Sequence, residues 1–291
     1  MPLYAITHAT TYRYTQPVAL SHQMLHLEPL NTAAQECLHF ALKVSPRPLE
    51  SVAGTDYFGN RVHDVVITER HRELRIEAHS KVTVTPVRPR NGSATCGQLR
   101  AWLENSTDSD AHQARQFLYD SPFTPRIPAV ADFARRFFGD ARPVSDALGE
   151  LGATIHQKFV FDRTATTTAT PLAEFFQRGR GICQDFAHLA VAALRAAGLP
   201  ARYVSGYLLT EPPPGQSRLI GADASHAWVS ALVPDVGWLD FDPTNDCLCD
   251  ERHVTVARGR DYGDVSPVRG TMVGGADHTL HLAVTVNPVG E

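Results

Sequence analysis

The sequence of 291 residues predicts an α+β fold, in which an antiparallel β domain precedes a domain that packs helices against an antiparallel sheet. Two patterns predict this order. Up to about residue 90 apolar and polar residues alternate without helical spacing, as in antiparallel sheets. Later the apolar residues recur at three- and four-residue steps, and strand-like stretches return near residue 201. We expect a β-sandwich-like domain over residues 1–90 and a catalytic-type domain over 91–291, with its core at 143–250 and strands at its C-terminal end.

The first domain is expected to consist of strands rich in Thr, Tyr, Val and Ile, which favour extended backbone. The expected strands cover 3–18, 37–45, 62–69 and 73–85. Asp56-Tyr-Phe-Gly-Asn-Arg61 has the composition of a turn. Pro86-Val-Arg-Pro-Arg-Asn-Gly-Ser93 is the best linker between the domains.

The second domain begins with helical spacing and ends with strands. The expected helices cover 111–119, 128–138, 143–159 and 171–176. The expected strands cover 201–209, 226–233, 238–242, 253–257 and 279–286, with an irregular loop at 211–224. This mixture places helices on one side of an antiparallel sheet.

A single cysteine stands where a Gly-rich turn meets an Ala-rich apolar run. After Gly179 and Gly181, Cys183 occupies the first turn of a helix that ends at Gly198, before Leu-Pro200. The partial positive charge at a helix N-terminus favours thiolate, and its free N–H groups can receive an oxyanion. Cys183 is therefore a candidate nucleophile, although a lone cysteine is more often a buried, inert side chain.

A base and a carboxylate are expected from the hairpin that follows. His226 lies on its first strand and Asp242 on its second, with Pro234-Asp-Val-Gly237 as the turn. If this turn has an odd number of residues, His226 and Asp242 lie on the same face of the hairpin and are offset by about two residues. Their Cα atoms would then be roughly 7 Å apart. Asp240 would be offset from His226 by about four residues, or roughly 13 Å, so Asp242 is preferred as the partner of His226. The order Cys–His–Asp is the layout of a papain-type nucleophilic triad.

Other residues near these positions have weaker indications. The backbone N–H of Gln184 could join an oxyanion hole, although its side chain could simply face solvent. Asp185 most simply complements the helix N-terminus. Tyr203 and Tyr207 share one strand face and are expected to line a substrate cleft, and Trp228 is expected in the core or in the wall of that cleft.

Four motifs give a specific resemblance. Gly181-Ile-Cys-Gln-Asp-Phe-Ala-His188, Gly198-Leu-Pro-Ala-Arg-Tyr-Val-Ser-Gly-Tyr207, Ser225-His-Ala-Trp228 and Gly237-Trp-Leu-Asp-Phe-Asp-Pro-Thr-Asn245 occur in this order. Together they resemble the bacterial transglutaminase-like family, closely over residues 150–250. The resemblance implies a papain-like core with an N-terminal β domain, and it matches Cys183, His226 and Asp242 to the family's nucleophile, base and orienting carboxylate.

Composition excludes several other classes. The formal charge of −4, from 27 basic and 31 acidic residues, gives no electrostatic reason to expect nucleic acid or an anionic membrane as a partner. No apolar run has membrane-spanning length, and the first residues lack the pattern of a secretory signal, so we expect a cytoplasmic protein. The five cysteines do not have the spacing of a disulfide framework, so disulfide bonds are not expected.

No metal or other cofactor is expected. Cys247-Leu-Cys249 lacks the second pair of ligands that a zinc motif has, and no acidic loop has EF-hand spacing. The function expected is cysteine-dependent acyl transfer through a thioester to a peptide or protein substrate, with hydrolysis of amide or peptide bonds preferred. Amine incorporation or deamidation by a protein-glutamine γ-glutamyltransferase is one alternative. A binding module with an idle triad is another.

Overall fold

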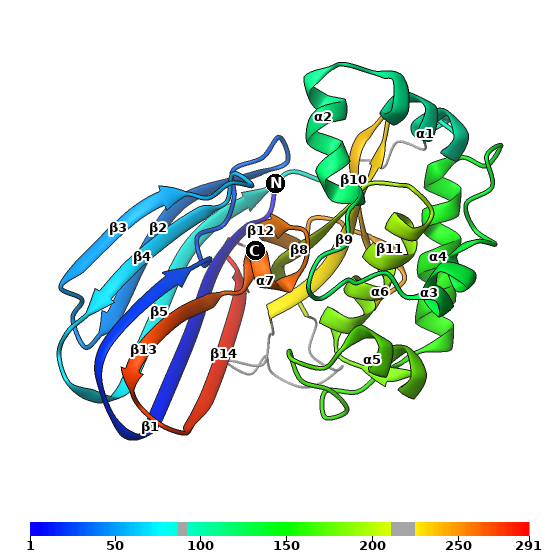
Figure 1. Ribbon diagram of the computed structural model, residues 1–291. Coiled ribbons are helices and arrows are strands. Elements are labelled where there is room, and N and C mark those ends of the chain that lie inside the picture. Colours follow the sequence, from blue (N-terminus) through cyan, green and yellow to red (C-terminus); the bar gives the residue numbers. More distant parts are fainter. Residues whose placement is uncertain (87–91, 211–224, 291) are drawn as a thin grey trace, which may run out of the picture.

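The structure is a computed structural model that describes residues 1–86, 92–210 and 225–290. A large antiparallel sheet and a helical part with a smaller sheet lie side by side, and the two chain ends lie close together (Figure 1). The α+β class is as predicted. No helix in the described ranges has the length and apolar composition that a membrane span needs.

Strand β1 (Leu3–Leu25) runs through the whole large sheet. Its first half pairs with β5 (His71–Val84) and β14 (His278–Pro288). Its second half pairs with β4 (Arg61–Ile67) and β13 (Val268–Gly274), after a break in register between Arg13 and Val18. β2 (Gln35–Ser45) extends the first group of strands through β5, and β3 (Glu50–Thr55) extends the second through β4.

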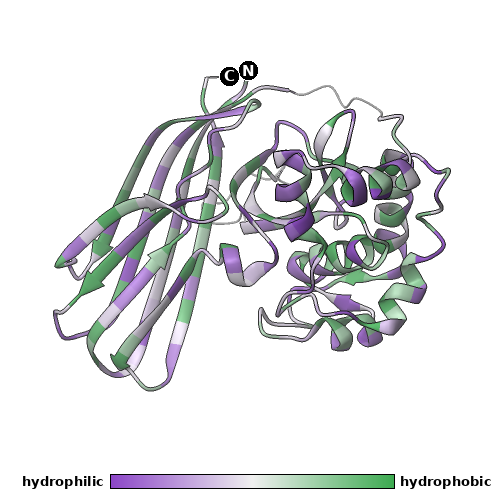
Figure 2. Ribbon diagram, turned by 45° about the horizontal axis from the view of Figure 1, so that its top comes forward, coloured by the Kyte–Doolittle hydropathy of each residue, from purple (hydrophilic) through white to green (hydrophobic). Residues whose placement is uncertain are grey.

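The two groups of strands enclose an apolar core of their own. It is made by residues that alternate inward along the strands, namely Tyr14, Val18, Leu25, Leu27, Val65, Ile67, Leu74, Ile76 and Ala78. The same alternation is visible as bands of hydrophobic and hydrophilic colour along the strands (Figure 2). Because β1 contributes to both groups, the sheet curls around this core.

The C-terminal strands correct the expected domain organisation. The sequence analysis assigned them to the second domain, but β13 and β14 both pair with β1. Alternating composition predicts that a segment is a strand without specifying which sheet edge it joins. Only strand 253–257, which lies within β12 (His253–Gly259), belongs to the smaller sheet. The boundary predicted at residue 90 falls outside the described residues, as do most of the expected linker and the expected loop at 211–224.

The smaller sheet has the strand order β11-β10-β9-β8-β12. Its remaining strands are β8 (Ala201–Leu208), β9 (Ser225–Val233), β10 (Gly237–Asp242) and β11 (Cys247–Leu248). Helix α6 (Cys183–Ala196) packs on β9 and β8 and is buried from Gln184 to Arg195. It ends as predicted, because Gly198 has a φ of +75°, which glycine adopts most readily.

The other helices are α1 (Cys96–Asn105), α2 (Ser109–Arg115), the 3₁₀ turn η1 (Gln116–Leu118), α3 (Pro128–Ala134), α4 (Val144–Lys158), α5 (Leu172–Arg178) and α7 (Tyr262–Val265). Helices α3, α4 and α5 pack against α6, whereas α7 packs on β12 and β8, on the side of the large sheet (Figure 1). A short parallel pair, β6 (Val160–Phe161) with β7 (Arg180–Gly181), leads into α6. Helix α1 was not predicted, because its segment of the sequence is short and only weakly apolar.

Buried hydrogen bonds join the large sheet to β12. The side-chain N–H of Gln35 donates to the carbonyls of Leu30 (2.6 Å) and Thr255 (2.8 Å), and its oxygen accepts from the Thr255 N–H (2.8 Å). Asn60 forms a similar pair with the backbone of Arg258, at 2.8 and 2.7 Å. These bonds fix the position of one sheet against the other, because a buried amide is costly to leave unpaired.

Replacing Gln35 with Leu should lower the free energy of unfolding by about 1–3 kcal/mol, because it removes the side-chain oxygen that accepts from the buried Thr255 N–H and the donor to the carbonyls of Leu30 and Thr255. Chemical denaturation of the variant measures this change. Gln113→Leu, at an exposed position of α2, is the control and should change stability little. Equal stability of the Gln35 and Gln113 variants would contradict the role given to this contact.

Candidate active site

Cys183 lies at the N-terminus of α6 because the preceding turn is tight. Gly179 ends α5 with a φ of +70°. A Cβ at Gly181 would lie 2.4 Å from Oδ2 of Asp185 and 2.7 Å from the ring of Phe175, so this position requires glycine. The half-buried Cys183 follows directly and lines a cleft.

Asp185 and Gln184 secure the turn around this cysteine. Oδ2 of Asp185 accepts hydrogen bonds from the Ile182 N–H (2.9 Å) and from Oγ1 of Thr166 (2.6 Å). The buried side chain of Gln184 donates to the Thr168 carbonyl (3.0 Å), so it does not face solvent. The backbone N–H groups of Cys183 and Gln184 belong to the first helical turn, which has no intrahelical acceptors. The role of these N–H groups as oxyanion donors stays a prediction.

The β9–β10 hairpin brings His226 and Asp242 together. Val233 pairs with Gly237, which leaves a turn of odd length, and the register places Asp242 two residues from His226. Nε2 of His226 lies 2.6 Å from Oδ2 of Asp242. Asp240 pairs with Ser230 instead, and its carboxylate accepts from Nε1 of Trp228 (3.3 Å). The predicted choice of Asp242 over Asp240 agrees with this geometry.

The imidazole of His226 also interacts with Cys183. Burial alone would lower the pKa of His226, but the charge of Cys183 and hydrogen bonds with Asp242 and Cys183 raise it to about 10. Since Nε2 is engaged by Asp242, Nδ1 is left for the sulfur. Below about pH 10 the imidazolium form is therefore favoured, which is the partner that a thiolate needs. The three predicted residues meet at one point.

Asp242 is held by more groups than the sequence indicated. Its side chain is fully buried. Oδ1 accepts from the N–H groups of Thr244 (2.9 Å) and Asn245 (3.2 Å), and Oδ2 accepts from Nδ2 of Asn245 (2.6 Å). A second imidazole, that of His253, lies 3.3 Å from Oδ2. Burial would raise the pKa of Asp242, but the hydrogen bonds from His226 and His253 outweigh it and keep the pKa far below its ordinary value.

His253 and Asn245 are the residues that sequence reasoning missed. Asn245 stands in the Asp-Pro-Thr-Asn motif, and its proximity to Asp242 could have been noticed there. His253 begins β12, whose place beside β8 the sequence does not specify. Its side chain is 2% exposed and also contacts Asp250 through Nδ1 (3.1 Å).

A cleft of about 520 Å³ opens between the helical part and the large sheet. One side of it carries Cys183 and His226, and another wall comes from β1, β13 and β14. The wall residues are His8, Thr10, Tyr12, Val268, Leu280 and Leu282. The large sheet is therefore part of the site.

The three expected cleft residues lie in different places, and only the position of Tyr207 differs from the expectation. Tyr203 does line the cleft. Tyr207 instead points to the large sheet, where its hydroxyl lies 3.0 Å from Nδ1 of His8. Trp228 is fully buried behind the imidazoles, with ring centroids 6.2 Å from His226 and 5.3 Å from His253, so it supports them without lining the cleft. Strand alternation alone could not show where the cleft ends along β8.

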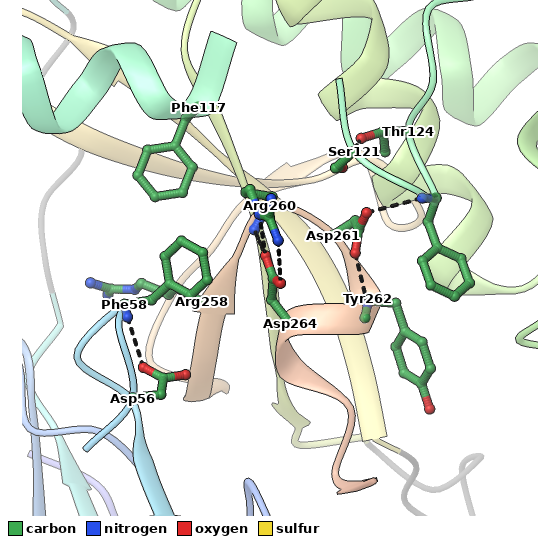
Figure 3. Close-up of polar contacts among 12 residues, drawn as sticks. Asp56, Phe58, Phe117, Ser121, Thr124, Arg258, Arg260, Asp261, Tyr262 and Asp264 are labelled. Carbon is green, nitrogen blue, oxygen red and sulfur yellow. Dashed lines mark hydrogen bonds and ion pairs between the residues drawn. The ribbon is translucent and has the colours of Figure 1, made fainter. Parts of the chain in front are cut away.

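Helix α7 adds Tyr262 to the cleft. Asp261 accepts from the N–H groups of Phe123 (2.9 Å) and Gly263 (2.8 Å), and Arg260 binds Asp264 (Figure 3). The Tyr262 N–H donates to Nε2 of the buried His188 (3.1 Å), whose pKa burial lowers to about 3. His188 is therefore a neutral acceptor with a structural role.

Cys183 should react with iodoacetamide at pH 6, because the His226 imidazolium stabilises the thiolate below about pH 10. In His226→Ala we expect reaction only above about pH 8, as for an ordinary cysteine. Mass spectrometry of the Cys183 peptide measures the rate, and His39→Ala, at an exposed position, is the control. Identical pH profiles for wild type and His226→Ala would refute the activated thiol.

Replacing His253 with Ala should slow alkylation of Cys183 at pH 6 about tenfold and displace the pH profile toward alkaline values. The reason is that Asp242 loses a hydrogen bond of the charged type, worth about 1.5–3 kcal/mol. His253→Gln keeps an N–H donor and should restore part of the rate. If both variants lose stability equally but keep the wild-type pH profile, His253 is only structural.

Comparisons with known proteins agree with this geometry. Residues 4–83 match the model of the bacterial transglutaminase-like N-terminal region, and residues 131–243 match that of the transglutaminase-like superfamily. An uncharacterized protein of Mycobacterium tuberculosis is 39% identical over 98% of this chain and 92% of its own length. One of Mycobacterium leprae is 28% identical over 97% of both chains.

Two further likenesses concern the fold and the core. The crystal structure of a candidate cysteine protease from Cytophaga hutchinsonii aligns with a TM-score of 0.75 at 22% identity, over 98% of this chain and 90% of that one. A protein-glutamine γ-glutamyltransferase of Pseudomonas aeruginosa is 36% identical over 41% of this chain and 18% of its own length. The chain belongs to the transglutaminase-like superfamily, with the N-terminal region of its bacterial members.

Proposed function

We propose that the protein catalyses acyl transfer through a thioester on Cys183 and that its main reaction is hydrolysis of an amide or peptide bond in a peptide or protein. The observation that carries this proposal is the chain of contacts from Cys183 through His226 to Asp242 at the edge of the cleft. A cysteine used only for packing needs neither a raised imidazole pKa nor a buried carboxylate behind it.

The first half of the reaction forms the thioester. The Cys183 thiolate attacks the carbonyl carbon, and the N–H groups at the start of α6 stabilise the oxyanion. His226 then gives its proton to the leaving nitrogen, so an amine or ammonia departs as the C–N bond breaks. Asp242 keeps the imidazole oriented and stabilises its positive charge before that transfer.

The second half releases the acyl group. Water enters the cleft, the neutral His226 takes one of its protons, and the oxygen adds to the thioester carbon. The C–S bond breaks, a carboxylic acid leaves, and the thiolate–imidazolium pair is restored. The volume of the cleft, about 520 Å³, is large enough for a short segment of a peptide or a protein loop as substrate.

Transfer to an amine is the second candidate. Its support is the Pseudomonas aeruginosa relative, whose printed name is protein-glutamine γ-glutamyltransferase, although only the core is shared. In this case the acyl group comes from a glutamine side chain, ammonia leaves, and a primary amine replaces water in the second half. Both reactions use the same thioester.

Incubation with a library of glutamine-containing peptides, with and without a primary amine, should reveal peptide fragments or new carboxylates in both samples if hydrolysis dominates. Ammonia release that requires the amine would favour transfer. Cys183→Ala should lower either rate by roughly 10³-fold or more. Cys37→Ala, at a half-buried cysteine of β2, is the control. Absence of a covalent adduct with acyl-donor probes would support a binding module with an idle triad.

A further inference from the structure

Three side chains that zinc commonly uses converge behind His226. Ligand atoms of Asp242, Cys247 and His253 all lie within 4.8 Å of one another. They provide a carboxylate oxygen, a thiol sulfur and an imidazole nitrogen, a combination that suits zinc better than calcium or magnesium. Cys247-Leu-Cys249 is by itself a poor zinc-binding motif. The ligands here come instead from three different strands.

The pairing of the local strands brings these three residues together. β11 pairs with β10 so that Cys247 lies opposite Asp242. The chain then turns, with the His253 N–H bonded to the Asp250 carbonyl (3.0 Å), and β12 begins at His253. The end of β10 and the starts of β11 and β12 therefore contribute one ligand each, and the three ligands meet at the same point.

The surroundings resemble the second shell of a metal site. Metal-bound histidines commonly donate their other ring nitrogen to a carboxylate. Nε2 of His253 faces Asp242 at 3.3 Å, and its Nδ1 lies 3.1 Å from Oδ1 of Asp250. His253 and Asp242 are buried, whereas Cys247 is partly exposed, so an ion can enter from the side of the sulfur.

We propose that Asp242, Cys247 and His253 form an inhibitory zinc site, which withdraws Asp242 from His226 when it is occupied. The regulatory part rests on the proposed function, whereas the binding part does not. Zn²⁺ replaces the proton of the Cys247 thiol, which is released. Nε2 of His253 binds the ion through its lone pair, and the single proton of the neutral imidazole then lies on Nδ1 and is donated to Oδ1 of Asp250. A water molecule completes four-coordination.

Inhibition follows from competition for one oxygen of Asp242. The carboxylate interacts with His226 through Oδ2, the oxygen that His253 also faces. A dication bound to this oxygen competes with Nε2 of His226 for it. The imidazole then loses the hydrogen bond that holds it in place, although Cys183 is untouched.

The binding test uses the full-length Cys183→Ala protein, which removes the catalytic thiol as a competing ligand. We expect one Zn²⁺ per chain in competition with a chromophoric chelator, and a thiolate charge-transfer band with Co²⁺. Adding Cys247→Ser should abolish both signals, and adding Asp250→Asn should weaken binding about 10–100-fold. Adding Cys37→Ser is the control and should change neither. Binding that survives Cys247→Ser, or no binding to the parent variant, overturns the site.

The regulatory test uses the wild-type thiol and Cys247→Ser, read out by turnover of a peptide substrate and by alkylation of Cys183. Zinc should slow both in wild type, chelator should reverse the effect, and Cys247→Ser should be resistant while keeping its metal-free rate. Equal inhibition of Cys247→Ser would place the ion on Cys183 and His226 and overturn the regulatory part. If no substrate is turned over, alkylation and metal binding still decide the proposal, so its failure is distinct from that of the proposed function.

Discussion

The buried carboxylate of Asp242 is the constraint on which the site depends. A charge with no solvent contact is tolerated only when hydrogen-bond donors surround it, and Asp242 receives them from His226, Asn245, His253 and the backbone after it. The same donors fix the β10–β11 turn and the start of β12. Removing the charge would therefore disturb the local fold and the base together, which makes stability and reactivity inseparable at this position.

The large sheet completes the site from the opposite side. Residues of β1 and β14 face Cys183 across the cleft, and Gln35 and Asn60 fix the sheets in relation to each other through backbone atoms of β12. Side chains of the N-terminal region therefore form one wall of the cleft. The polar His8 and Thr10 lie on this wall together with the apolar Leu280 and Leu282, so the wall has both a polar and an apolar part.

The sequence predicted the parts of the site that depend on local pattern. Helical spacing after a Gly-rich turn predicted that Cys183 lies at the N-terminus of a helix. An odd number of residues in a short hairpin turn predicted that His226 and Asp242 lie on the same face. It did not predict contacts that depend on which distant strands meet. His253 and the wall of β14 belong to strands whose partners are set by the assembled sheets, and Tyr207 shares a strand face with Tyr203 but reaches a different neighbour. Periodicity carries no information about such partners.

The path of the chain through the large sheet has a consequence for biosynthesis. Tyr4 on β1 pairs with Pro288 on β14, so the earliest and latest strands of the described chain are neighbours. A ribosome releases the segment with the thiol, the imidazole and the carboxylate before it releases the strand that walls the cleft. A nascent chain that already contains Cys183, His226 and Asp242 but lacks β14 therefore has one wall of the cleft still missing.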